Sequence, residues 1–273
     1  MNVYVIIKTD RVEDVKMLFV ADIGNTSITT GIYDGEKLLY TWKLASDKKR
    51  SEDEYGIILH NFIQQAGFSG KLEGAIISSV VLPLTERFVV AIEKYLKVPA
   101  INLTHKTKTG IKIDLDKPRD LGADRIANAC AAYNIYKKAA VVVDFGTATT
   151  FDIVSSDGRF LGGVITPGIR ISADALNAFT SLLPKVRIEA PPATIGKNTI
   201  DAMLSGLVLG HGAMIDGLIE NVEKELKEPI ITIATGGYSE IITECLKRPF
   251  DYLNPNLTLE GLRLIYNLNK KPQ

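Results

Sequence analysis

The sequence is poor in the residues that build disulfide frameworks and metal clusters. It has two cysteines, Cys130 and Cys245, which lie far apart. Its three histidines occur in no metal-ligand or catalytic-triad spacing. Two distant cysteines argue against a disulfide framework and indicate a reducing compartment, so we expect a cytoplasmic protein.

An excess of charge and a secretory signal are also missing. Lysine and arginine together number 32, as do aspartate and glutamate, so the net charge is zero. Without an excess of either sign no long-range field gathers nucleic acid or anionic lipid, and we expect neither a nucleic-acid nor a membrane partner. Residues 1–16 begin with a short apolar run and a charged stretch, unlike a signal peptide. We interpret them as an N-terminal extension, either non-native or from an upstream start.

What the sequence does contain is one motif that occurs twice. Residues 18–26 and 140–150 each have an apolar run, an aspartate, an apolar residue, a glycine and then hydroxyl-bearing residues. The two aspartates, Asp22 and Asp144, lie 122 positions apart. Each copy leads into strand-like sequence and an Asp-Gly turn, as in a hairpin. The chain therefore contains two similar halves.

The segments between the copies alternate between helical and strand-like patterns. Apolar spacing predicts helices over 53–65 and 85–96 and a strand over 72–78. We predict an α/β protein of two domains, residues 17–138 and 139–273, which the length of 273 residues allows.

An Asp-x-Gly-x-Thr turn has a definite chemistry. Glycine lets the backbone approach a ligand, exposed amides and hydroxyls donate to phosphate oxygens, and the aspartate holds a metal ion or its waters. A single copy is more often an ordinary strand-ending turn, but two copies facing each other would grip a nucleotide's phosphates. A third turn, Gly236-Gly237 after the strand-like residues 231–235, would leave room for adenine or ribose.

This order of motifs resembles the phosphate-1, phosphate-2 and adenosine motifs of the actin, hexokinase and acetate kinase superfamily. The resemblance implies two ribonuclease H-like (actin-like ATPase) domains facing each other across a nucleotide cleft. Four further segments look like the type III pantothenate kinase family: residues 22–26, 121–125, 196–199 and 256–262. The resemblance runs from Met17 to about Tyr266. One departure is Leu115, where many members of that family carry tyrosine, so the resemblance does not carry over the substrate contact that this tyrosine usually supplies.

The resemblance implies roles for individual residues. Asp124 would be the catalytic base. Pantothenate would be bound by Gly122, Ala123, Asp124, Arg125 and Thr199. ATP would be bound by Asp22, Ile23, Gly24, Asn25, Thr26, Ser27, Ile28, Thr29, Thr147, Gly236 and Gly237. Asp22 would hold Mg²⁺ through water, and Asp144 a monovalent cation, K⁺ or NH₄⁺. The family also implies a homodimer.

Several of these residues also have a purely structural interpretation. Asp124 in the first turn of a helix complements the helix dipole, Arg125 is an ordinary surface side chain, and Thr199 caps the helix that follows it. Two other functions stay open. One is a kinase of the same fold for another small molecule, since Leu115 alters the pocket. The other is a nucleotide-binding regulator without catalysis, against which the joint presence of so many site residues argues.

Overall fold

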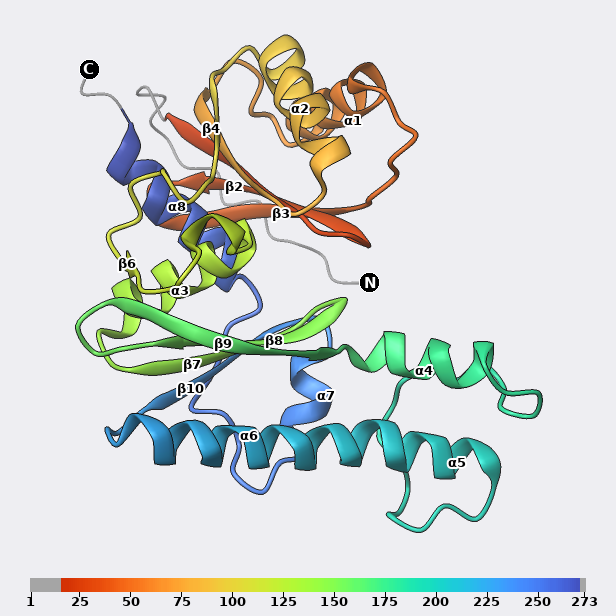
Figure 1. The fold of residues 1–273 in the computed structure, drawn as a ribbon. Helices are drawn as coiled ribbons and strands as arrows, with labels where there is room; N and C mark the ends of the chain where they lie inside the picture. Colours follow the sequence, from red (N-terminus) through yellow and green to blue (C-terminus); the bar gives the residue numbers. More distant parts are fainter. Residues whose placement is uncertain (1–15, 271–273) are drawn as a thin grey trace.

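The computed structural model describes residues 16–270, and residues 1–15 of the predicted extension lie outside the described residues. Two mixed sheets lie one above the other, with the helices α3 and α8 between them (Figure 1). Helices α1 and α2 cover the outer face of the first sheet, and α6 runs along the outer face of the second (Figure 1).

The first sheet has the strand order β3-β2-β1-β4-β5. Its strands are β1 (Met17–Ile23), β2 (Ser27–Asp34), β3 (Lys37–Ala45), β4 (Leu72–Ser79) and β5 (Ala100–Asn102). Strand β1 pairs antiparallel with β2 and parallel with β4, and this register sets Asp22 beside Ser78. Because both faces of β1 are covered, its residues form a continuous apolar run rather than an alternating one.

The second sheet has the order β11-β10-β7-β8-β9-β6. Its strands are β6 (Lys112–Ile113), β7 (Ala140–Phe145), β8 (Ala148–Val154), β9 (Arg159–Pro167), β10 (Ile231–Gly236) and β11 (Tyr252–Leu253). Strand β7 pairs antiparallel with β8 and parallel with β10, as β1 does with β2 and β4. The repeated motif in the sequence therefore corresponds to a repeated hairpin.

Helical segments fill the connections. They are α1 (Glu52–Gln65), α2 (Leu82–Ala91), η1 (Ile92–Leu96), η2 (Pro118–Asp120), α3 (Ala123–Tyr136), α4 (Ile169–Ala178), α5 (Thr199–Leu204), η3 (Ser205–Leu209), α6 (Gly210–Leu226), α7 (Ser239–Thr243) and α8 (Leu257–Asn269). Helices α3 and α8 approach each other closely, because a Cβ on Gly261 would overlap the backbone of Ala127. The last helix thus packs beside the centre of the molecule.

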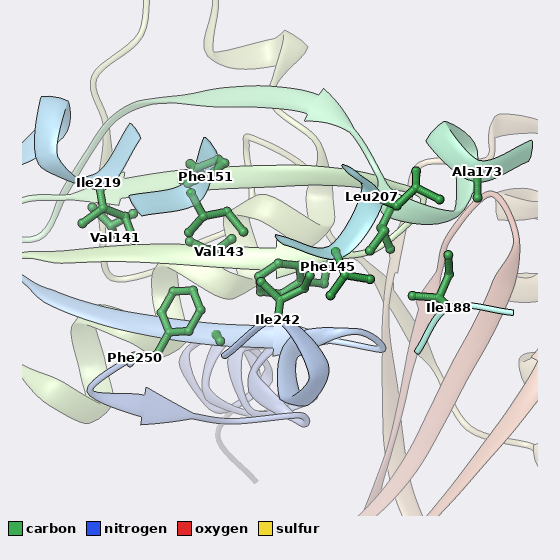
Figure 2. Packing of buried hydrophobic residues seen from close by; sticks show 14 of the residues in the cluster. Val141, Val143, Phe145, Phe151, Ala173, Ile188, Leu207, Ile219, Ile242 and Phe250 are labelled. Carbon is green, nitrogen blue, oxygen red and sulfur yellow. The ribbon is translucent and has the colours of Figure 1, made fainter. Parts of the chain in front are cut away.

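Alternate residues of β7 serve two cores. Val141 and Val143 pack with Phe151 and residues of α6 in the core drawn in Figure 2. Ala140 and Val142 point the other way and pack against α3. The central strand of the second sheet is thereby fixed on both faces, and its end, where the second Asp-x-Gly turn begins, has a defined position.

The helical run Thr199–Leu226 is long and apolar enough, by length and composition, to cross a membrane. Of its most apolar stretch, 56% is buried within the protein. Residues Leu207, Val208, Ile215 and Ile219 belong to the core below the second sheet, and the core helix of a globular protein passes the same test. The run continues as far as Leu226 because its apolar face packs against the second sheet.

Candidate functional site

The first Asp-x-Gly turn is a tight connection between β1 and β2. The amide of Gly24 donates to the carbonyl of Ser27 (3.1 Å), closing the turn. Asn25 and Thr26 are exposed at its tip, whereas the side chains of Ile23 and Ile28 are fully buried. The two isoleucines therefore offer a ligand only their backbone, and the exposed residues offer amides and a hydroxyl.

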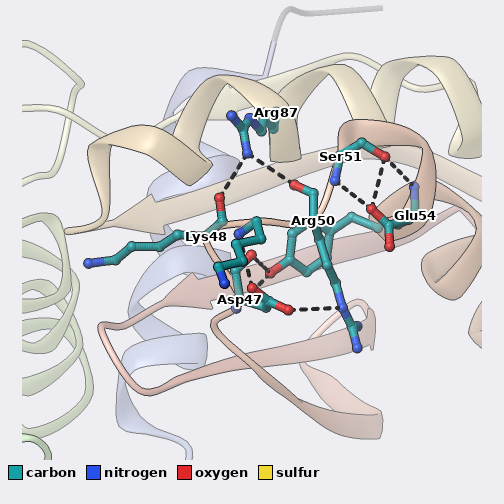
Figure 3. A network of polar contacts seen from close by, with 8 residues as sticks. Asp47, Lys48, Arg50, Ser51, Glu54 and Arg87 are labelled. Carbon is teal, nitrogen blue, oxygen red and sulfur yellow. Dashed lines mark hydrogen bonds and ion pairs between the residues drawn. The ribbon is translucent and has the colours of Figure 1, made fainter.

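The loop after β3 holds this turn in place. The Ser46 hydroxyl donates to the Gly24 carbonyl (2.5 Å), and the Ser46 amide donates to the Thr26 carbonyl (3.1 Å). The same loop is fixed further on by Arg87 of α2, whose Nη1 donates to the carbonyls of Lys48 (2.9 Å) and Arg50 (3.1 Å), as Figure 3 shows. A basic stretch thus acts here through its backbone.

The second turn meets the first. Thr147 is exposed at the end of β7, and its hydroxyl lies 2.9 Å from that of Thr26. The two residues are 121 positions apart in the chain. The structure therefore brings together the two copies of the motif at one place, where one ligand could reach both sets of amides and hydroxyls.

Two aspartates end the equivalent strands behind these turns. The Ser78 hydroxyl donates to Asp22 Oδ1 (2.5 Å), and Asn128 Nδ2 donates to Asp144 Oδ2 (3.1 Å). Asn128 in turn accepts from the Thr258 hydroxyl of α8 (2.7 Å). Both carboxylates are therefore oriented by a neutral donor, and within residues 16–270 neither is hydrogen-bonded to a lysine or arginine.

Three carboxyl groups of this region have raised pKa values. Burial and then the charge of Asp124 raise the pKa of Asp22 to about 7. Burial and the charge of Asp124 also raise the pKa of Asp144 to about 6. Burial raises the pKa of Asp124 itself, opposed by the hydrogen bond from the Arg125 amide. Such a site repels phosphate unless cations accompany it.

The carboxylates suit a cation that is shared with a ligand. Within residues 16–270, no three His, Cys, Asp or Glu side chains are close enough to hold a metal ion by themselves. Mg²⁺ commonly binds through one or two carboxylates together with water and substrate phosphates. Asp22, beside the first turn, has the chemistry for that arrangement.

Asp124 and Arg125 lie at the beginning of α3. Gly122 precedes the helix, and a Cβ there would come 2.5 Å from Asp124 Oδ1, so a side chain at this position would crowd the carboxylate. The Arg125 amide donates to Asp124 Oδ1 (2.8 Å). Arg125 is not an ordinary surface side chain, because its guanidinium reaches Asp152 on β8 with an Nε–Oδ1 distance of 2.5 Å.

The late glycine pair, Gly236 and Gly237, lies at the end of β10, beside the second turn. The Gly237 amide donates to the Phe145 carbonyl (3.1 Å). Gly236 has a φ of +87°, and a Cβ there would collide with Phe145 and with the carboxylate of Asp144. Nothing lies within 4 Å of a Cβ on Gly237, so open space borders the strand where a flat ring would fit.

Within one chain, Thr199 does not lie beside the two turns and their carboxylates. It is exposed at the beginning of α5, and Figure 1 shows α5 and α3 at opposite sides of the second sheet. It does not cap the helix either, because Asn198 does so by accepting from the Asp201 amide (2.9 Å).

Four polar residues that shape the site were missed by sequence reasoning: Ser46, Ser78, Asn128 and Asp152. Asn128 had a signal, since it follows Asp124 by one helical turn. Asp152 had another, since it is a single acid inside an apolar strand. Ser46 had none, and only the folded sheet sets Ser46 and Ser78 beside the first turn.

Paired hairpins, touching turns and a shared group of carboxylates are features of the actin-like ATPase and sugar kinase fold, and solved structures agree. Component A of (R)-2-hydroxyglutaryl-CoA dehydratase from Acidaminococcus fermentans is 12% identical, with a TM-score of 0.51 over 92% of this chain and 97% of that one. An inorganic polyphosphate/ATP-glucomannokinase from Arthrobacter is 14% identical, with a TM-score of 0.50 over 93% and 100%. The chain is therefore an α/β protein of this class.

Sequence comparison narrows the class to a family. A family model for type III pantothenate kinase matches residues 18–221. Proteins named type III pantothenate kinase are 44% identical in Dehalococcoides mccartyi strain CBDB1, over 93% of this chain and 96% of that protein, and 43% identical in Roseiflexus sp. strain RS-1, over 93% and 100%. The chain belongs to the type III pantothenate kinase family.

Proposed function

We propose that the protein transfers the γ-phosphoryl group of ATP to pantothenate, giving ADP and 4′-phosphopantothenate in the first step of coenzyme A biosynthesis. The observation that supports this is the 2.9 Å contact between the hydroxyls of Thr26 and Thr147, which brings the two turns together where one phosphate chain would reach both. The family supplies the acceptor. Proximity and charge neutralisation are what phosphoryl transfer requires of a protein.

ATP would lie across the two turns with its base beside the late glycine pair. The residues assigned to it are Asp22, Ile23, Gly24, Asn25, Thr26, Ser27, Ile28, Thr29, Thr147, Gly236 and Gly237. Support comes from the exposed amides and hydroxyls at both tips and from the open space at Gly237. Mg²⁺, held by Asp22 through water, would neutralise phosphate charge, and Asp22 is oriented for this by Ser78.

Asp124 would act as the general base. The primary hydroxyl oxygen of pantothenate bonds to the γ-phosphorus, the bond from that phosphorus to the ADP oxygen breaks, and the hydroxyl proton passes to the Asp124 carboxylate. Burial raises the pKa of Asp124 above its ordinary value, which makes it a better proton acceptor. Gly122 and Ala123 would border the acceptor, and Arg125 would meet its carboxylate.

Asp144 would hold a monovalent cation, K⁺ or NH₄⁺. Its carboxyl group has no lysine or arginine partner, and its only hydrogen bond within the described residues comes from Asn128. A cation there would offset the mutual repulsion of Asp144 and Asp124 that raises the pKa of Asp144.

A homodimer would complete the site. Large apolar side chains are exposed between residues 165 and 200, and two of them, Phe179 and Leu182, are 88% and 89% exposed. The others are Ile165, Ile171, Leu176, Ile195 and Ile200. Exposed apolar side chains in such number mark an interaction surface, and Thr199 is exposed in the same part of the chain, so a partner copy would bring its Thr199 to the acceptor. Light scattering should find a dimer that Phe179→Asp with Leu182→Asp dissociates, whereas Leu82→Asp, at an isolated exposed leucine, should leave it intact.

We also propose that the two predicted domains, residues 17–138 and 139–273, are the working units and that the protein is cytoplasmic. The separate sheets support this division. Two elements cross it: β6, from the first range, joins the second sheet, and α8, from the second range, packs against β1 and α3.

The test follows ADP release from ATP and Mg²⁺ with and without pantothenate, in K⁺ and in Na⁺. We expect release that depends on pantothenate and on K⁺, and a loss of about 10²–10⁴-fold in Asp124→Asn. A protein that binds ATP but shows no pantothenate dependence would overturn the substrate. The first alternative acceptors to test would then be those that fit beside Leu115, which packs near Gly162.

A further inference from the structure

The guanidinium of Arg125 lies in a slot on the second sheet. Its Nε donates to Asp152 Oδ1 (2.5 Å), its Nη2 donates to the Phe151 carbonyl (3.0 Å), and its central carbon lies 5.5 Å from the centre of the Phe160 ring. These contacts hold the group at one edge and one face. No hydrogen bond within residues 16–270 uses Nη1, so this nitrogen remains for a ligand.

The sequence builds this slot by leaving out a side chain. Asp152 on β8 is paired with Gly163 on β9. A Cβ on Gly163 would overlap Nη2 of Arg125 and the Phe151 carbonyl. Glycine at this position is what allows the guanidinium to lie flat against the strand pair, so the slot and its occupant fit one another.

The Arg125–Asp152 ion pair joins α3 to β8, and burying two charges in this way has a high desolvation cost. Asp152 is completely buried, and the Arg125 side chain is only 15% exposed. Asp152 Oδ2 has no hydrogen-bond partner in the described part of the chain, and burial raises the pKa of the Asp152 carboxyl to about 7 despite Arg125. Buried pairs of this kind seldom add net stability over apolar residues. A positioning role accounts for the pair better than stability does.

A reason to position this arginine lies beside it. Asp124 is the preceding residue, and Asp22 and Asp144 are close enough for Asp124 to raise the pKa of both. A free guanidinium would pair with one of these carboxylates. The Arg125 charge already lowers the pKa of Asp124 from its present position, and direct pairing would lower it further and would remove the positive charge from the acceptor.

We propose that Asp152, together with Gly163 and Phe160, is a positioning residue that keeps Arg125 away from the catalytic carboxylates and presents Nη1 to the carboxylate of the acceptor. The slot thereby makes the enzyme selective for an acceptor with a carboxylate over its neutral analogue. This inference rests on the proposed function and deepens it, since it names residues that Arg125 needs for substrate selection.

The test compares pantothenate with its primary amide, in which only the carboxylate is neutralised. Loss of a charged hydrogen bond predicts that Asp152→Asn raises the KM for pantothenate about 10–100-fold. The KM for ATP should stay within about two-fold, and kcat should fall less than KM rises. Activity toward the amide should differ little between variant and wild type, so that most of the discrimination between the two acceptors is lost.

The matched control is Asp114→Asn. It removes an Asp–Arg pair of the same second sheet, Arg159 Nη1 to Asp114 Oδ2 at 3.1 Å, whose side chains are 41% and 44% exposed. This variant should keep wild-type kinetics with both acceptors. Phe160→Leu, which removes only the aromatic face, should shift pantothenate KM a few-fold in the same direction and covers the case that Asp152→Asn folds poorly.

The outcomes separate the two proposals. Equal losses toward pantothenate and the amide would mean that Asp152 is merely structural, and unchanged discrimination in both variants would overturn the inference while leaving the kinase assignment intact. A wild type that turns over neither acceptor would overturn the function and the inference together.

Discussion

The two halves of the molecule share one frame but hold their aspartates differently. The order β3-β2-β1-β4-β5 of the first sheet recurs as β9-β8-β7-β10-β11 in the second, with β6 added at the edge. Asp22 and Asp144 end equivalent strands. Asp22 is held by Ser78 of the neighbouring strand, whereas Asp144 is held by Asn128 of α3.

Asp22 is held entirely within its own half of the molecule, whereas Asp144 is held by a helix of the other half. The first turn and Asp22 are oriented by β4 and by the loop after β3, all within the first half. Asp144 depends on α3, the helix that begins with Asp124, and through Asn128 on Thr258 of α8. A shift of α3 would therefore move the proposed base and the proposed cation ligand together and would leave Asp22 in place.

The largest expected effect on activity comes from replacing the two aspartates, which should not respond in the same way. Asp22→Asn should lower kcat/KM about 10²–10³-fold, the size seen when one group that stabilises transition-state charge is removed. Added K⁺ should not restore it. Asp144→Asn should instead raise the K⁺ concentration needed for half-maximal activity, and high K⁺ should recover part of the rate. Titration of both variants with KCl at constant ionic strength checks this, and identical K⁺ responses would show that the aspartates are interchangeable.

The donors behind the aspartates give the next effect. Asn128→Ala leaves Asp144 and the Thr258 hydroxyl without a partner, so the free energy of unfolding should fall by about 1–3 kcal/mol. Ser78→Ala removes only one hydroxyl beside Asp22 and should cost less. Urea denaturation of the two variants measures both, and the comparison fails if Ser78→Ala is the more destabilising.

The raised pKa values predict a stability that depends on pH. An aspartate in the unfolded chain has a pKa of about 3.9, whereas burial and the charge of Asp124 raise the pKa of Asp22 in the folded protein to about 7. The folded state therefore binds this proton more tightly, and the stability it contributes is lost as pH rises through 7. The melting temperature without nucleotide should fall by several degrees between pH 5 and pH 8.

Asp22→Asn removes that titration. Its melting temperature should change less over the same range and should exceed that of the wild type at pH 8. Asp53→Asn is the control: the Asp53 carboxylate is exposed, and hydrogen bonds from Lys94 and Tyr95 lower its pKa, so the wild-type slope should remain between pH 5 and pH 8. Equal slopes for wild type and Asp22→Asn would exclude Asp22 as the source.

The smallest expected effect comes from the two threonines at the tips of the turns. Thr26 and Thr147 are exposed, so replacing either by alanine should change the free energy of unfolding by less than about 0.5 kcal/mol. Each change should raise the KM for ATP a few-fold. If both hydroxyls act on one phosphate chain, the double variant should lose less than the product of the two single effects. A strictly multiplicative loss would place the two hydroxyls on independent sites.

Much of this fold was readable from local pattern. Helix 53–65 and strand 72–78 were predicted within two residues of their observed bounds, because each has a strong period and a clear boundary signal.

By itself the sequence determined that two Asp-x-Gly turns end two buried strands, because apolar runs, glycines and hydroxyls specify local backbone and exposure. Only the tertiary structure decided that Thr26 meets Thr147, that Ser78 and Asn128 orient the two aspartates, and that Arg125 pairs with Asp152. These contacts join residues 16 to 121 positions apart, and their formation depends on how the two sheets pack around α3 and α8. The same reason leaves Thr199 far from Asp124 in a single chain.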